Sequence, residues 1–310
     1  MDGIFFLVLA FLVAFSSIKL SYFGDALSKQ TKLGSALIGG LLIASITSLP
    51  EFVTSISAVL LNNPALSFGD ILGSNMFNIF VLAIYNIWFF KKDIFKNADT
   101  KYKYECIILL VEYLLIYLGT KTNFLDLATI SLIIMYILYM IKIIKSNDEE
   151  DNLSTGFVEH PLIKFTGCAL LLIVLSILLT FQADKITHIY PQVSSSTVGA
   201  ILLGITTSLP EVVSTFALLK YNNNNMAISN MLGSNIFNFL VLAFSDIFVK
   251  NDHIYHYSDF YSYAYLFGGI LITTLLLTMI IKKAKNKLFY TLISLVMSLS
   301  YLLVWYFQFK

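Results

Sequence analysis

Two glutamates inside apolar segments are the residues of this chain best suited to chemistry. Glu51 and Glu211 each follow the string Thr-Ser-Leu-Pro, in stretches that contain no lysine. A carboxylate at membrane depth costs a few kcal/mol, and an acid that is kept there generally has a function. Because no lysine in these stretches can neutralise the two acids, we expect both of them to bind a cation.

Each acid is accompanied by a proline and by two hydroxyl side chains. Pro50 and Pro210 lack a backbone N–H, so the helix that holds each acid should kink or break and free a carbonyl oxygen. Freed carbonyls are tolerated at membrane depth where they line a cavity. The hydroxyls are those of Thr47, Ser48, Thr207 and Ser208. A cavity so rich in oxygen atoms suits hard cations.

A second string that occurs twice, Gly-Ser-Asn-x-Phe-Asn, adds amides and further hydroxyls. Its candidate ligands are Ser74 and Asn78 in the first copy and Ser234 and Asn238 in the second. In each copy the serine and the last asparagine are four residues apart, so they share one helix face. The glycine before the serine, Gly73 or Gly233, permits the close approach of a neighbouring helix.

The candidate ligands are oxygen atoms, which indicates Ca²⁺ or Na⁺ rather than a transition metal. The chain has no histidine cluster and no cysteine pair with metal-ligand spacing. Ca²⁺ takes roughly six to eight oxygen ligands, and the charge of two glutamates neutralises one Ca²⁺. The same pair could hold sodium ions or protons instead. A site that holds either load but not both gives antiport, and it needs no organic cofactor.

The composition is that of a membrane protein. Of 310 residues, 57% are apolar and 13% are charged, whereas a soluble chain carries about 25% charged residues. This composition excludes a soluble enzyme and a disordered protein, and the net charge of only +1 argues against binding nucleic acid. We expect an all-α integral membrane protein, without enzymatic activity, whose partners are the lipid bilayer and transported cations. A monomer is the simplest state.

Ten apolar segments are long enough to cross a bilayer, for which a helix needs about 20 residues. They are residues 3–20, 36–61, 67–90, 104–119, 124–144, 161–182, 196–219, 226–248, 261–281 and 287–307. A polar stretch at residues 146–160 divides them into two sets of five. We therefore expect two halves, residues 1–145 and 161–310, joined by a polar cytoplasmic linker.

The lysines predict the orientation. The chain has 20 lysines and no arginine. Sixteen lie in or beside the loops that follow the first, third, fifth, seventh and ninth segments, and four lie on the opposite side. Because positive residues favour the cytoplasmic side, we expect a multi-pass protein of the cell membrane with both termini extracellular.

The two shared strings form an internal repeat. Every aligned pair of residues is 160 positions apart, in α-repeats that cover about residues 36–90 and 196–248. Five predicted spans, an odd number, separate the copies, so the copies should cross the membrane in opposite directions. Inverted repeats are typical of secondary transporters, whose ions bind near the midplane where the repeats meet.

At these strings the chain resembles the sodium/calcium exchanger family of the calcium/cation antiporter superfamily. The resemblance implies ten helices in two inverted five-helix halves, with helices 2 and 7 broken and helices 1 and 6 sliding over the core. It implies exchange of Na⁺ for Ca²⁺ by alternating access, with Ca²⁺ coordinated by Glu51, Glu211 and the backbone oxygens of Thr47 and Thr207. The flanking sodium sites would be built by Ala44, Ser48, Ser74, Gly204, Ser208 and Ser234.

The chain departs from that family at Asn238. Sodium/calcium exchangers often place an aspartate there, whereas this chain has an asparagine that matches Asn78. Proton/calcium exchangers resemble the chain in having both amides, but their acid motif is usually Gly-Asn-Ala-x-Glu. We therefore favour sodium coupling over proton coupling, and either over an uncoupled cation channel or a non-transporting scaffold. No Gly-x-x-x-x-Gly-Lys-Ser/Thr string supports ATP-driven pumping.

Two further acids lie in apolar segments. Asp70 stands opposite Asn230 in the repeat and near the start of its predicted span. An acid is favourable at a helix N-terminus, so we expect Asp70 to cap that helix. Glu112 has no acidic counterpart in the other half, and the sequence assigns it no role.

Overall fold

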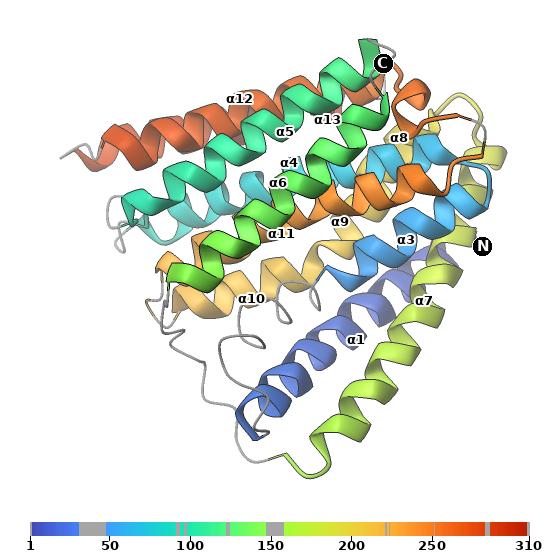
Figure 1. Cartoon of the computed structure of the whole chain (residues 1–310), viewed down its shortest axis with the longest axis horizontal. Coiled ribbons are helices and arrows are strands. Elements are labelled where there is room, and N and C mark those ends of the chain that lie inside the picture. The colour runs from blue at the N-terminus through green and yellow to red at the C-terminus, as the bar shows by residue number, and fades with distance from the viewer. Residues whose placement is uncertain are drawn as a thin grey trace.

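The computed structural model describes residues 2–30, 48–90, 94–95, 98–121, 125–146, 158–220, 222, 224–250, 252–282 and 286–308. Each regular element in these ranges is a helix (Figure 1). Helices suit so apolar a chain, because a bilayer offers no hydrogen-bond partners and a helix satisfies its own backbone. The protein is therefore an all-α membrane protein.

Seven helices are long and apolar enough to cross a bilayer. They are α1 (Asp2–Gln30), α4 (Pro64–Trp88), α6 (Leu125–Ser146), α7 (Pro161–Ile189), α11 (Asn224–Ile247), α12 (Phe260–Lys282) and α13 (Lys287–Phe307). A bent pair of helices between residues 195 and 220 makes an eighth span if it is counted as one. The described residues thus hold fewer clear spans than the ten expected.

Two of the expected spans account for the difference. The helix α5 (Lys103–Lys121) coincides with the segment expected at 104–119, but it carries two lysines and two glutamates and is more charged than the other spans. The segment expected at 36–61 is described only from Ser48 onward, where α3 (Leu49–Leu60) is a short apolar helix. The stretch before Ser48 lies outside the described residues.

The helix between residues 195 and 220 bends near its middle. Three short elements, α8 (Ser195–Val198), the π-helix η3 (Gly199–Leu203) and α9 (Gly204–Thr207), precede the bend. After a change of direction of 42°, α10 (Leu209–Lys220) continues. Pro210 explains the bend, because it cannot donate to the carbonyl four residues earlier. The bend places Glu211 in the first turn of α10.

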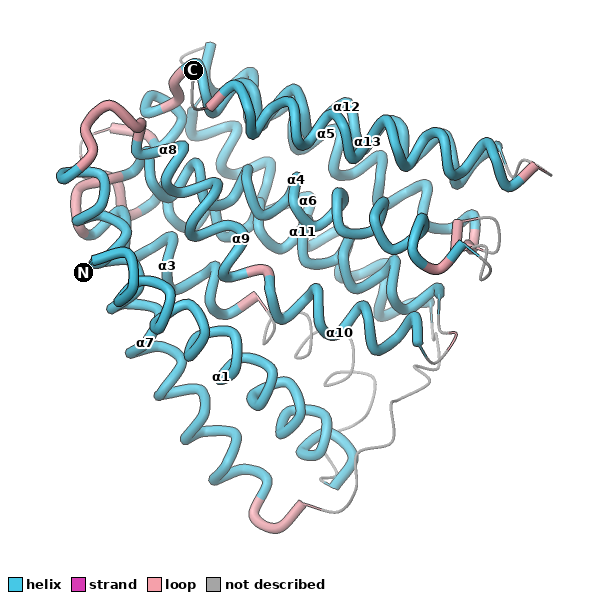
Figure 2. Tube along the Cα trace, turned by 180° about the vertical axis from the view of Figure 1, so that it is seen from behind, coloured by secondary structure: helices cyan, strands magenta, loops and turns pink. Residues whose placement is uncertain are grey.

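The helices α4 and α11 form the centre of the bundle. Of their apolar spans, 67% and 78% are buried, against 22% for α7. The helix α4 packs against α3, α11, α12, α13 and the bent helix. At one side of the bundle α1 and α7 pack along each other, and Figure 2 shows this pair from behind. The two central helices carry the two copies of the string Gly-Ser-Asn-x-Phe-Asn.

Both chain termini lie at the same end of the bundle (Figure 1). Near the end of α7, Lys185 Nζ lies 2.7 Å from Asp2 Oδ1 at the start of α1. At the start of the bent helix, Thr197 donates to Gln308 Oε1 at 2.5 Å, just beyond α13. Two 3₁₀ turns, η2 (Thr100–Tyr102) and η4 (Ile254–Tyr257), lie in the connections before α5 and α12.

The bent helix lies against α4 backbone to backbone. A Cβ at Gly73 would come within 2.4 Å of Ala200 Cα, a distance that real Cβ atoms do not show. The counterpart of Gly73 in the other repeat is different, because a Cβ at Gly233 would meet only the Tyr139 hydroxyl, at 3.0 Å. The close helix approach that the sequence led us to expect at both glycines occurs at Gly73, whereas a tyrosine side chain fills the space at Gly233.

We predict that Gly73→Ala destabilises the protein far more than Gly233→Ala does. The first Cβ meets backbone that cannot move, which should cost about 1–3 kcal/mol. The second Cβ meets the far end of a side chain, and alanine has a higher helix propensity than glycine. Thermal unfolding in detergent measures both, with Gly167→Ala as a control because nothing lies within 4 Å of that position. Equal melting temperatures for the two variants would contradict the packing described.

Candidate cation-binding site

The two repeated glutamates lie inside the bundle at the starts of helices. Glu51 is in the first turn of α3 and Glu211 in the first turn of α10. Both side chains are fully buried, at 0% exposed. The positive end of a helix stabilises a carboxylate in its first turn. Among the described residues, no lysine forms an ion pair with Glu51. The helix N-terminus and nearby hydroxyl groups therefore stabilise its negative charge.

Serines from opposite halves of the chain hold the two glutamates. Ser208 Oγ donates to Glu51 Oε1 at 3.3 Å, and Ser48 Oγ donates to Glu211 Oε1 at 3.2 Å. Ser234 Oγ also donates to Glu211 Oε1, at 3.3 Å, and lies 3.0 Å from Ser48 Oγ. The structure thus brings five of the candidate residues together, and each glutamate is hydrogen-bonded by the other half.

Three further candidates lie beside this group. Ser74 Oγ donates to the backbone carbonyl of Gly204 at 3.3 Å. The Thr207 hydroxyl donates to the carbonyl of Leu203 at 3.0 Å, and its side chain also approaches Glu51. Ser74 therefore contacts a carbonyl oxygen of the other half, whereas its counterpart Ser234 contacts a carboxylate.

Four asparagines join α4 to α11, and we call this set the asparagine lock: Asn75, Asn78, Asn235 and Asn238. Asn75 donates to the backbone carbonyl of Asn235 at 3.1 Å, and Asn235 donates to that of Asn75 at 2.9 Å. Asn78 and Asn238 donate to Oδ1 of Asn235 and Asn75 respectively, each at 2.9 Å. Every bond has a counterpart with the halves exchanged. The lock fixes the register of the two central helices.

Several buried oxygen atoms of this region have no hydrogen-bond donor among the described residues. They are Glu51 Oε2, Asn78 Oδ1 and Asn238 Oδ1. A buried polar atom without a partner calls for an ion or a water molecule. Because the lock engages the amide nitrogens of Asn78 and Asn238, their oxygens are the atoms left for a ligand. Such oxygens are the ligands that Ca²⁺ takes in proteins.

Asp70 belongs to this buried region and does not cap a helix. Asn63 caps α4 by accepting from Leu66 N, and Asp70 lies six residues after the first residue of the helix. Asp70 Oδ2 accepts from Thr54 Oγ1 at 2.7 Å and from Ser55 Oγ at 3.4 Å. The expected capping role is therefore wrong, because α4 begins earlier than its hydrophobic pattern indicated. The mismatch with Asn230 was the signal in the sequence that marked this position.

The remaining candidates are not part of the described cluster. Ala44 and Thr47 lie outside the described residues. Glu112 is fully buried in α5, and neither of its carboxylate oxygens has a partner within the ranges that the structure describes. Burial alone therefore does not distinguish the repeated glutamates from other membrane acids. Their distinguishing feature is a hydrogen bond from a serine of the other half.

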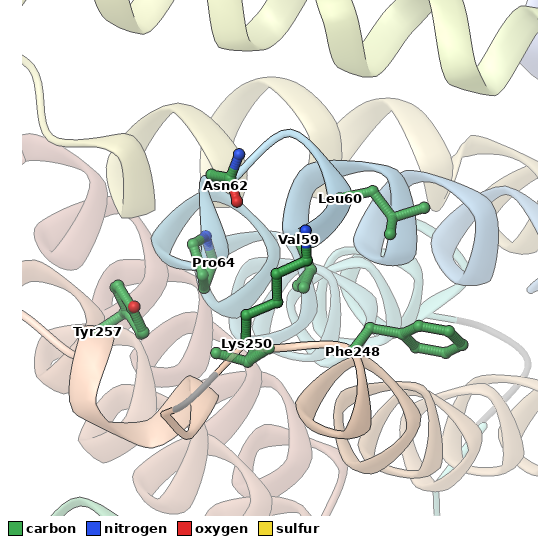
Figure 3. A pocket seen from close by; sticks show the side chains of 8 residues that line it. Val59, Leu60, Asn62, Pro64, Phe248, Lys250 and Tyr257 are labelled. Atoms are coloured by element: carbon green, nitrogen blue, oxygen red, sulfur yellow. The ribbon is translucent and has the colours of Figure 1, made fainter.

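A cavity of about 70 Å³ lies near the end of α3 and away from the glutamates (Figure 3). Its lining includes Val59, Leu60 and Pro64 around the α3–α4 turn, and Phe248 and Lys250 after α11. Val59 is eight residues beyond Glu51, which is roughly 12 Å along a helix. Because a lysine ammonium repels cations, we do not assign cation binding to this cavity.

Comparison with known proteins gives a match over nearly the whole chain. The model of the sodium/calcium exchanger protein family matches residues 3–145 and 160–310. The inner membrane protein YrbG of Escherichia coli (strain K12) is 25% identical over 244 residues, which cover 74% of this chain and 74% of that protein. The putative antiporter CaxA of Alkalimonas amylolytica is 25% identical over 249 residues, which cover 77% of this chain and 78% of that protein.

Two solved structures share the fold. YfkE superimposes with a TM-score of 0.72 at 14% identity, over 100% of this chain and 93% of that one. The sodium-calcium exchanger NCX_Mj, soaked with 2.5 mM Na⁺ and 10 mM Sr²⁺, superimposes with a TM-score of 0.65 at 21% identity, over 98% of both chains. The likeness therefore extends over both halves of the chain.

We predict that Asn235→Leu, a change of similar volume, destabilises the protein by roughly 2–5 kcal/mol. It removes two bonds of the asparagine lock and leaves the Asn78 amide nitrogen without its acceptor. Asn75→Leu should cost about as much, because the lock is reciprocal. Thermal unfolding in detergent without Ca²⁺ measures both. The exposed Asn225→Leu is the control and should change stability by less than about 1 kcal/mol. A melting temperature of Asn235→Leu like that of wild type would contradict the lock.

Proposed function

Because this chain belongs to the sodium/calcium exchanger protein family, we propose that it is a secondary antiporter that exchanges Na⁺ for Ca²⁺ by alternating access. One observation carries the proposal: Glu51 and Glu211 are fully buried, and each accepts a hydrogen bond from a serine of the other half. Ser234, which donates to Glu211, lies one helical turn before Asn238, whose Oδ1 has no described donor. An enclosed group of acidic and amide oxygens matches a hard cation. Such an antiporter is not an enzyme and needs no organic cofactor.

In this proposal the carboxylates of Glu51 and Glu211 bind Ca²⁺, with the amide oxygens of Asn78 and Asn238 and the backbone oxygen of Thr207 as further ligands. Thr47 takes the place in the first repeat that Thr207 takes in the second. The flanking sodium positions involve Ala44, Ser48, Ser74, Gly204, Ser208 and Ser234. The hydroxyls that now donate to the glutamates would turn their oxygen atoms toward Na⁺ when the ion arrives.

The charge of the pair explains why transport is coupled. Two ionised carboxylates without a cation are expensive in a medium of low dielectric. One Ca²⁺ or two Na⁺ neutralise the pair of glutamates. The change between outward-open and inward-open states is therefore favourable only for a loaded site, and each ion must leave in exchange for another.

We propose ten membrane helices in two inverted five-helix halves, with helices 2 and 7 broken next to Pro50 and Pro210. The 42° bend before α10 supports the second break. The reciprocal bonds of the asparagine lock, between positions 160 residues apart, support a pseudo-two-fold relation of the halves. The packing of α1 along α7 at the side of the core supports the sliding of these two helices as one unit.

We propose that the protein lies in the cell membrane with both termini outside and residues 146–160 as a cytoplasmic linker. The position of both termini at one end of the bundle supports an even number of spans (Figure 1). The sixteen lysines on one side against four on the other support the orientation.

Proton coupling is the second candidate, and the amides at Asn78 and Asn238 favour it. Uptake of ⁴⁵Ca²⁺ into proteoliposomes separates the two couplings. We expect uptake when the vesicles are loaded with Na⁺ and diluted into Na⁺-free buffer at matched pH, and none when they are loaded with choline. Uptake with a pH gradient alone would select proton coupling, and uptake with neither gradient would indicate a channel.

We predict that Glu51→Gln and Glu211→Gln each lower Na⁺-dependent ⁴⁵Ca²⁺ uptake at least about 100-fold, because an amide cannot balance the charge of the ion. Both variants should still elute as folded protein in size-exclusion chromatography. Glu105→Gln is the matched control. Glu105 lies outside this cluster, where its Oε1 is 3.3 Å from Lys142 Nζ, and the variant should transport like wild type. Wild-type uptake by Glu51→Gln would refute the assignment.

A further inference from the structure

The cavity at the α3–α4 turn is lined by one positive charge and by no negative charge. Its lining includes Lys250, Asn62 and Tyr257 beside apolar side chains, and none of its residues is acidic. In Figure 3 the Lys250 side chain reaches from the segment after α11 toward the turn that holds Asn62. A lysine in a hollow without acids makes the local potential positive, so the cavity favours an anion.

Within the described parts of the chain, no carboxylate compensates the charge of Lys250. No ion pair joins this lysine to an acid, although several acids lie at the same end of the bundle. Those acids already contact other side chains: Asp2, Asp126, Asp184, Asp246, Asp252 and Asp259. A counter-ion of Lys250 therefore lies outside the described residues.

Three side chains of the cavity have hydrogen-bonding groups to spare. The ammonium of Lys250, the amide of Asn62 and the hydroxyl of Tyr257 have no hydrogen-bond partner among the described residues. These groups offer three, two and one donors respectively. They come from the segment after α11, from the α3–α4 turn and from η4. Because phosphate oxygens accept charge-assisted hydrogen bonds from such donors, the lining suits a phosphate group.

The size of the cavity indicates a single small group. A cavity needs about 10–15 Å³ to hold one water molecule, and this one measures about 70 Å³. A pocket for a whole drug-sized molecule measures roughly 300–1,000 Å³. The cavity therefore has room for a phosphate but not for a whole organic substrate.

Exposed apolar side chains accompany the polar groups of the cavity. Leu60 is 61% exposed and Phe248 is 46% exposed, and both belong to the lining. The cavity lies at the ends of α3 and α11. Tyrosines and lysines at the ends of membrane helices lie at the level of the lipid headgroups. A phospholipid brings a phosphate and hydrocarbon chains to such a place together, whereas a free phosphate makes no use of the apolar side chains.

The lack of an acid in the lining also selects among phospholipids. A zwitterionic headgroup carries an ammonium beside its phosphate, and Lys250 would repel that ammonium while no carboxylate of the lining binds it. A glycerol headgroup carries hydroxyls instead, which Asn62 and Tyr257 can bind. A phospholipid with a net negative charge therefore fits the cavity best.

We propose that this cavity binds the phosphodiester group of an anionic phospholipid, with Lys250 as its ion-pair partner and with Asn62 and Tyr257 as hydrogen-bond donors. The acyl chains of the lipid then lie along Leu60 and Phe248. The bound lipid joins the end of α3, in the first half of the chain, to the segment after α11, in the second half. This site goes beyond the proposed exchange and does not depend on which ions are exchanged.

Thermal unfolding of the purified, lipid-depleted protein in a non-ionic detergent tests the site, with dioctanoyl phosphatidylglycerol as the added lipid. We expect the melting temperature of wild type to rise with lipid concentration, because a ligand that binds only the folded state stabilises it. Lys250→Gln should need at least about fivefold more lipid for the same rise. Lys250→Arg keeps the charge and should respond like wild type.

Lys121→Gln is the matched control for the loss of a lysine. Lys121 Nζ lies 4.6 Å from the ring centroid of Tyr263, at the same end of the bundle but outside the cavity. Its response to the lipid should therefore equal that of wild type. Without lipid, Lys250→Gln should melt at the wild-type temperature, because Lys250 has no described partner within the protein. A clearly lower temperature would assign this lysine a structural role instead.

The remaining outcomes separate the possible occupants of the cavity. An equal response of wild type and Lys250→Gln to the lipid would overturn the site. An equal response of wild type to dioctanoyl phosphatidylcholine would overturn the preference for an anionic headgroup. The same rise with inorganic phosphate alone would identify a site for soluble anions and overturn the lipid assignment.

Native mass spectrometry gives a second readout that does not depend on unfolding. After phosphatidylglycerol is added and the detergent is washed briefly, we expect wild type to retain one lipid more than Lys250→Gln. Lys121→Gln should retain as many lipids as wild type. Equal numbers of retained lipids in wild type and Lys250→Gln would count against the proposed site.

Discussion

An ionised carboxylate in an apolar interior is stable only if donors or cations surround it, and few donors reach Glu51. One serine hydroxyl donates to its Oε1, the Thr207 side chain approaches it, Oε2 has no described donor, and the helix end supplies only a partial charge. The fold around it therefore encloses the acid without fully satisfying it. In the proposed exchanger a mobile cation would make up this shortfall, whereas a lysine in the same place would satisfy the charge permanently.

Such a site keeps its geometry only if the helices around it stay in register. Two kinds of contact hold α4, α11 and the bent helix in register. The asparagine lock joins α4 to α11 through four reciprocal hydrogen bonds, and at Gly73 the backbone of α4 touches the bent helix directly. Neither contact leaves room for another register. The pair α1 and α7 instead packs along the side of this core, whereas α3 and α10, which carry the acids, pack against α4 and α11.

Much of the fold could be predicted from the sequence, because membrane helices are set by local apolarity. The ends of α13 agree with the expected residues 287–307, and the repeated strings contain the three serines that donate to the two glutamates. The reciprocal use of Asn75 and Asn235 could not be predicted, since spacing gives a helix face but not the partner it meets. The start of α4 was also misjudged: Pro64 and the cap Asn63 begin the helix before its apolar pattern is strong, and this made Asp70 look terminal.

Each glutamate accepts a hydrogen bond from a serine of the other half, and this arrangement bears on how the molecule evolved. Because Ser208 serves Glu51 and Ser48 serves Glu211, an ancestor that consisted of one half would have completed its site only by pairing with a second copy of itself. Joining two copies in one chain removes the need for identical sequences. Each copy is then free to specialise, as Asp70 opposite Asn230 shows, and a symmetric dimer could not have acquired such a difference one side at a time.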